Sequence, residues 1–112
     1  MDFEILEESP ELTRIALKGA LDTTGVDRIE TRLNAILARG GHGVLDLSDV
    51  TFLTSLGIRL LIGLAKLLNR RGRKLVLVAP RPLVDQALRH SSIDELIPVV
   101  GSPDEARTLL DG

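Results

Sequence analysis

Two adjacent hydroxyl residues, Thr54 and Ser55, are the part of this sequence best suited to chemistry. They follow the apolar strand segment 44–47 and a polar turn, and they precede a helical pattern of apolar residues that begins at Gly57. The start of a helix carries unpaired backbone N–H groups and a partial positive charge, so it can accommodate an anion. Ser55 is therefore expected either to cap this helix or to carry a phosphoryl group.

Other polar residues near this segment have simpler interpretations. Asp22 stands in a loop before a helix, where capping or turn formation accounts for it. Asp46 is polar within an apolar strand and is expected to hydrogen-bond the loop that leads to Ser55, and Asp49 is expected in a turn. Arg59 lies one helical turn beyond Ser55 on the same face, where it could steady a phosphate, contact an acidic partner or remain solvated.

Composition and motifs argue against several other classes of protein. The chain has 112 residues, no cysteine and a formal net charge of −2, which disfavours thiol chemistry and a nucleic-acid partner. His42 and His90 are isolated from each other and from any carboxylate cluster, and no glycine-rich nucleotide motif is present, so neither a metal nor a cofactor is predicted. The basic run 69–74 falls at a helix end, where cations complement the helix dipole. Without a signal-peptide pattern or a membrane-spanning apolar run, we expect a cytoplasmic protein with no direct membrane insertion.

Hydrophobic periodicity predicts a single α/β domain over residues 1–112. Alternating side chains predict two strands, at 3–6 and 12–18, joined as an antiparallel hairpin. The elements predicted after this hairpin are a helix at 26–37 with Thr23 and Thr24 as candidate N-caps, a buried strand at 44–47, a helix at 57–68, a strand at 75–79, a helix from Pro82, a strand at 97–100 and a helix from Pro103. The later strands should pair in parallel through right-handed crossovers, which gives a mixed sheet packed against about four helices.

Two motifs in these elements resemble the STAS domain family. The family's central pattern is an apolar strand with Asp or Asn, a short turn, an apolar pair and an Asp-Ser-x-Gly-leucine-like helix start, and it is similar to Val-Leu-Asp-Leu at 44–47 followed by Phe-Leu-Thr-Ser-Leu-Gly-Ile at 52–58. The family's Gly-x-Leu-Asp turn before its first helix resembles Lys-Gly-Ala-Leu-Asp at 18–22. The order and spacing of the elements also match between residues 3 and 110, so the resemblance covers nearly the whole chain.

The best-known members of this family are bacterial anti-sigma factor antagonists, and the resemblance implies their partner-switching cycle. The unphosphorylated protein would bind an anti-sigma factor that is also a serine protein kinase with a histidine-kinase-like ATPase fold, and would thereby free a sigma factor. That kinase would phosphorylate Ser55, with Thr54 as the alternative acceptor, and a PP2C-type serine phosphatase would reverse the modification. The chain would be a kinase substrate and not an enzyme. The resemblance implies partner contact by Asp22, Thr54, Ser55, Leu56, Gly57, Ile58 and Arg59.

Three departures from the family's Asp-Ser-Ser-Gly-Leu-Gly pattern leave other functions open. Thr54 replaces the Asp, Leu56 replaces the second Ser and Arg59 replaces the last Gly. A STAS subunit of a transporter or signalling complex that is not phosphorylated is therefore an alternative. A receiver domain with Asp46 or Asp49 as phosphoacceptor also fits a strand followed by an acid, but receivers need an acidic pair just after the first strand and a Lys after the last strand. Here the acidic pair Glu7-Glu8 precedes a hairpin partner and not a helix, and the last strand is followed by Gly101-Ser102.

Overall fold

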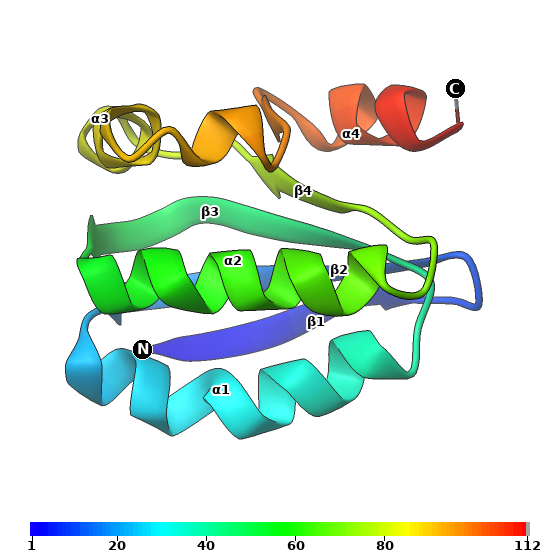
Figure 1. Cartoon of the computed structure of the whole chain (residues 1–112), viewed down its shortest axis with the longest axis horizontal. Coiled ribbons are helices and arrows are strands. Elements are labelled where there is room, and N and C mark those ends of the chain that lie inside the picture. Colours follow the sequence, from blue (N-terminus) through cyan, green and yellow to red (C-terminus); the bar gives the residue numbers. More distant parts are fainter. Residues whose placement is uncertain (112) are drawn as a thin grey trace.

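The computed structural model describes residues 1–111 as one five-stranded sheet with helices on both of its faces (Figure 1). In chain order the elements are β1 (Asp2–Glu8), β2 (Leu12–Leu21), α1 (Thr23–Ala38), β3 (His42–Leu53), α2 (Ser55–Asn69), β4 (Leu75–Val78), α3 (Pro82–His90), the short 3-10 helix η1 (Ile93–Glu95), β5 (Val99–Val100) and α4 (Pro103–Asp111).

The strands lie in the sheet in their chain order, from β1 to β5. β1 pairs with β2 in the antiparallel sense, and every later pair of neighbours is parallel. A parallel pair needs a crossover that returns the chain to the same end of the sheet, and α1, α2 and α3 supply these crossovers. The mixed sheet with an opening hairpin, expected from the sequence, is confirmed.

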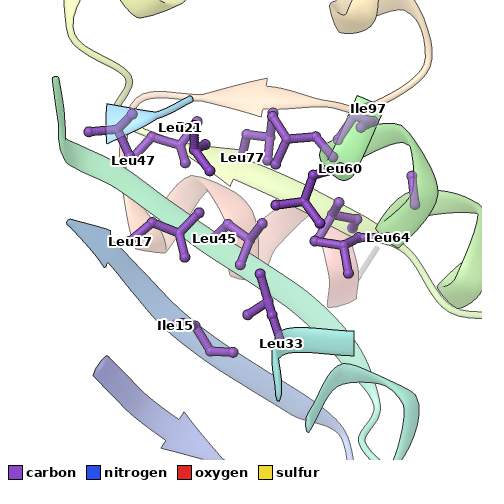
Figure 2. Close-up of a cluster of buried hydrophobic side chains, with 14 of the residues drawn as sticks. Ile15, Leu17, Leu21, Leu33, Leu45, Leu47, Leu60, Leu64, Leu77 and Ile97 are labelled. Carbon is purple, nitrogen blue, oxygen red and sulfur yellow. The ribbon is translucent and has the colours of Figure 1, made fainter. Parts of the chain in front are cut away.

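Alternating side chains of the strands divide the core between the two faces of the sheet. In β4, Leu75 and Leu77 join a large cluster with α1, α2 and α3, whereas Val76 and Val78 join a smaller cluster with Ala106 of α4. The larger cluster consists mainly of leucine and isoleucine, and Figure 2 shows side chains from the strands and from α2 meeting there. Each such side chain contributes about 1.5–3 kcal/mol when it is fully buried, so this layer anchors the helices to the sheet.

The strand boundaries differ from the sequence-based prediction. The hairpin strands are longer than 3–6 and 12–18, and β3 runs to Leu53 instead of ending at 47. The polar residues after position 47 suggested a turn, but they lie on exposed positions of a strand that stays paired with β2, where Ala20 faces Phe52. β4 ends at Val78, because Ala79 adopts a left-handed backbone conformation with φ 53°.

The last strand, β5, is only Val99–Val100, although 97–100 was predicted. Pro98 has no N–H group to donate to a neighbouring strand, so the ladder cannot extend backwards through it.

Candidate functional site

The candidate site lies where β2 and β3 end and the helices α1 and α2 begin. In Figure 1 both helices start at the left of the view, beside the carboxyl ends of the parallel strands. Leu21, the last residue of β2, pairs with Leu53, the last residue of β3. The residues that follow these two strands, Asp22 and Thr54, are the N-caps of α1 and α2. The topology therefore brings two sequence-distant candidates to one edge of the sheet.

Thr54, and not Ser55, caps α2. The Thr54 backbone is extended at φ −100° and ψ 175°, and its side-chain oxygen accepts a hydrogen bond from the Gly57 N–H at 3.4 Å. The same hydroxyl donates to the Leu21 carbonyl oxygen at 2.8 Å, and the Thr54 N–H donates to that oxygen at 3.1 Å. The expectation that Ser55 itself caps the helix is wrong, because Ser55 already has helical geometry and cannot fold its oxygen back onto the first turn.

Ser55 is the first residue of α2 and its side chain is exposed. In the first turn, the cap satisfies the Gly57 N–H, and the Ile58 N–H donates to the Thr54 carbonyl at 3.0 Å. The N–H groups of Ser55 and Leu56 remain the two positions that an α-helix leaves without a partner of its own. An exposed hydroxyl thus sits beside two outward backbone donors and the positive end of a helix dipole.

Gly57 brings the start of α2 close to the end of β2. A Cβ atom at Gly57 would lie 2.7 Å from Leu53 Cδ1 and 2.8 Å from the Leu21 carbonyl oxygen, which is closer than real Cβ contacts. Gly25 has the corresponding position in α1, where a Cβ would lie 2.1 Å from the Ala20 carbonyl oxygen. The missing side chains allow both helix starts to pack against the same strand end.

Asp22 is half-buried, and its Oδ1 accepts a hydrogen bond from the Gly25 N–H at 2.8 Å. This bond confirms the capping interpretation and corrects the expectation that Thr23 or Thr24 caps α1. Because Asp22 follows Leu21 directly, the cap of α1 is one residue away from the carbonyl that holds Thr54.

The remaining predicted contact residues differ in their access to a partner. Leu56 and Ile58 are partly buried against the large cluster, and Gly57 is buried. Arg59 is exposed. Sequence reasoning missed Phe52, whose side chain is 59% exposed three positions before Ser55. The sequence feature that could have indicated Phe52 is an aromatic residue within the polar end of β3. Exposed aromatic side chains next to a candidate site are common contacts for a partner protein.

Asp46 and Asp49 belong to the strand and not to a turn. Asp46 Oδ1 accepts a hydrogen bond from the Ser48 N–H at 2.9 Å, so it does bond the segment after position 47 that leads to Ser55, although that segment belongs to β3 and is not a loop. Asp49 lies opposite Lys18 in β2 and approaches Arg81 to 3.7 Å. Arg81 also donates from Nε to the Ser48 carbonyl at 2.7 Å, so these contacts tie the start of α3 to β3. The hydrogen bond expected of Asp46 is therefore present, whereas the turn expected at Asp49 is wrong, because Asp49 lies in β3.

His42 is far from the candidate site in the sheet, because it begins β3 at the opposite end. Its Nδ1 accepts a hydrogen bond from the Lys74 N–H at 3.0 Å. Burial, together with the charges of Arg73 and Lys74, lowers the pKa of the His42 imidazole below its ordinary value, although Asp111 opposes the shift. Within residues 1–111, no three side chains of the metal-binding types gather as a metal site would require. No helix in the same range is long and apolar enough to cross a bilayer.

With this geometry in view, comparison with known proteins defines the family. Residues 5–106 match the STAS domain family, and the chain belongs to it.

Individual relatives are distant in sequence but alike in fold. The anti-sigma F factor antagonist of Paenibacillus polymyxa is 26% identical over 99 residues, which cover 87% of this chain and 85% of that protein. The anti-sigma factor antagonist SpoIIAA in its unphosphorylated form superimposes with a TM-score of 0.82 at 20% identity, over 99% of this chain and 97% of that one. The phosphorylated form of SpoIIAA, a Bacillus cell fate determinant, gives a TM-score of 0.73 at 19% identity, over 97% and 99%. The likeness to the two solved structures shows that the fold is shared.

Proposed function

We propose that this chain is an anti-sigma factor antagonist whose binding to an anti-sigma factor is switched by phosphorylation of Ser55. The observation that carries the proposal is the exposed Ser55 hydroxyl at the start of a capped helix in a STAS domain. The curated relative is named as an anti-sigma F factor antagonist, and SpoIIAA has been solved both with and without phosphate. The partner proposed for this chain is an anti-sigma factor that acts as a serine protein kinase, with a PP2C-type serine phosphatase as the opposing enzyme.

The geometry at Ser55 favours a switch that leaves the domain folded. A phosphoryl group adds about −1.5 to −2 charges and three acceptor oxygens. The outward N–H groups at the helix start and the dipole of α2 tolerate this charge, and no packed side chain has to move because Ser55 is exposed. The cost then falls on the bound partner, and a penalty of about 3 kcal/mol would weaken binding more than a hundredfold.

The hydrogen bonds of Thr54 make it the weaker candidate for phosphorylation. Its hydroxyl donates to the Leu21 carbonyl and accepts from the Gly57 N–H, so a kinase would have to break both bonds to reach it. The Ser55 side chain does not make the cap hydrogen bond of α2. We therefore assign the acceptor role to Ser55 and a positioning role to Thr54.

The surrounding residues fit a contact surface and not a catalytic centre. Ser55, Arg59 and Phe52 are exposed, whereas Asp22 and Leu56 are partly buried at its border. Gly57 packs closely against Leu21 and Leu53, and Ile58 packs against the large cluster, so both lie under the surface. In this proposal the chain is a cytoplasmic kinase substrate that carries no enzymatic activity of its own.

The experiment compares three versions of the purified protein. Candidate anti-sigma factor kinases of the source organism are titrated by calorimetry against the native chain, Ser55→Ala and Ser55→Asp. Ser55→Ala should bind like the native chain, and Ser55→Asp should lose at least ten- to a hundredfold in affinity. A phosphopeptide measurement over residues 46–59 of protein isolated from cells should place the phosphate on Ser55.

Two results would reject the phosphorylation switch. Equal binding of Ser55→Ala and Ser55→Asp would leave the fold without a switch and favour a STAS subunit of another assembly. Phosphate on Asp46 or Asp49, detected as an acid-labile acyl phosphate, would indicate receiver-type chemistry instead.

A further inference from the structure

A cavity of about 250 Å³ opens at the other end of α2, away from Ser55. Figure 1 shows the carboxyl end of α2, the start of β4 and α4 together at the right of the view. The cavity's lining residues in α2 are Ala65 and Asn69, so the cavity lies about 15–21 Å along the helix from Ser55 at 1.5 Å per residue. Its apolar walls are Ala65, Leu75, Leu96, Pro98 and Leu109. The cavity is therefore a separate feature from the proposed phosphorylation site.

The cavity exists because β5 is too short to cover the start of β4. The hydrogen bonds between these strands begin with the Leu77 N–H, which donates to the Pro98 carbonyl at 2.9 Å. Pro98 has no N–H to continue the ladder towards Leu75. The helix α2 lies on one face of this open edge and α4 lies on the other, so a slot remains between the two helices.

One wall of the slot is an apolar side chain without full packing. Leu96 directly follows η1, and it is 67% exposed beside the cavity. Buried apolar area stabilises a complex roughly in proportion to the area removed from water. An apolar group placed in the slot would remove part of the exposed Leu96 surface from water, whereas Leu75 is already buried and would supply only van der Waals contact.

The polar groups of the slot are cationic or neutral. Lys74 and Asn69 line it, and among residues 1–111 no carboxylate lies within ion-pair distance of the Lys74 ammonium group. Asn69 also borders an open hollow with Lys66 and Arg70. Segment 66–74 contains five basic residues and no acidic one. Burial is the main cause of the lowered pKa of His42, and the charges of Arg73 and Lys74 add to it against the opposing charge of Asp111.

We propose that this slot binds a small amphipathic carboxylate, with its apolar chain between α2 and α4 and its carboxylate against Lys74. The apolar walls favour a hydrocarbon chain, and the unpaired ammonium at the rim favours one negative charge. A larger polar anion such as a nucleotide fits poorly, because only two of the seven lining residues are polar.

The test uses short-chain carboxylates as probes of the isotope-labelled protein in nuclear magnetic resonance titrations. Hexanoate should shift the signals of the lining residues in a saturable way, and butanoate should bind more weakly by about fourfold for each methylene removed. Hexylammonium, which has the same chain and the opposite charge, should not bind at the slot.

Two variants with a matched control separate the two parts of the site. Lys74→Gln should weaken hexanoate binding at least fivefold, and Leu96→Ser should weaken it at least threefold. Both residues are exposed, so the amide spectra should show that the fold is retained. Arg28→Gln, an exposed cation on α1, should leave the affinity unchanged.

The proposal is overturned by any of three outcomes. Hexanoate could produce no saturable shifts, it could bind with equal affinity to Lys74→Gln, or hexylammonium could bind the same residues as tightly. None of these outcomes depends on Ser55, so the result is independent of the proposed phosphorylation switch.

Discussion

Replacement of Gly57 by Ala tests how tightly the candidate site is attached to the sheet. In an open helix position, Ala is more favourable than Gly by about 1 kcal/mol. At Gly57 the added Cβ would meet Leu53 Cδ1 at 2.7 Å, the Leu21 carbonyl oxygen at 2.8 Å and Leu21 Cβ at 2.9 Å. Because Thr54 holds that carbonyl by two hydrogen bonds, the strand end cannot withdraw without a cost.

Overpacking of this kind costs about 1–3 kcal/mol, so Gly57→Ala should lower the free energy of unfolding by about 1–2 kcal/mol after the propensity gain. Gly63 is the matched control, because it lies in the same helix and a Cβ there would have no neighbour within 4 Å. Gly63→Ala should raise the free energy of unfolding by up to about 1 kcal/mol. Urea titration monitored by circular dichroism measures both variants. If the two substitutions shift the midpoint in the same direction by similar amounts, the close approach of α2 to β2 is not real.

Two further predictions concern the cap of α1 and the histidine at the far end of the sheet. Asp22→Ala removes the acceptor of the Gly25 N–H and should destabilise the fold by about 1 kcal/mol, whereas Asp22→Asn keeps an acceptor oxygen and should cost much less in the same urea titration. Burial holds the pKa of His42 in the folded protein below its ordinary value of about 6.5, so the unfolded chain binds the proton more readily. The free energy of unfolding should therefore be fully retained above about pH 6.5 and fall as the pH drops below it, and His42→Gln should reduce this slope in urea titrations between pH 5 and pH 8, whereas an unchanged slope would contradict the assignment.

The order of elements was predictable from the sequence because apolar spacing records which face of each element is buried. Leu60, Leu61, Leu64 and Leu68 follow the helical period, and all four are buried in α2. The continuous apolar run that begins at Leu75 likewise becomes a strand covered on both faces. Periodicity reports burial directly, so it performs best in such central elements.

The helix caps and strand ends were not predictable in the same way. Thr54 and Ser55 both carry hydroxyl groups at a helix start, and only the extended backbone of Thr54 and its bond to Leu21 decide which one is the cap. The polar end of β3 looked like a turn because its pairing with β2 is a long-range contact that local composition does not reveal. The exposure of Phe52 could not be predicted from composition either, because an aromatic residue in a strand is usually buried.

The two hydrogen bonds from Thr54 to one carbonyl of β2 also fix the backbone next to Ser55. These two bonds join the first turn of α2 to the end of β2, beside the buried leucines that pack the rest of the helix on the sheet. An enzyme that modifies Ser55 would have to recognise a folded surface formed by the end of β2 and the start of α2. A linear peptide with the same residues would not present that folded surface.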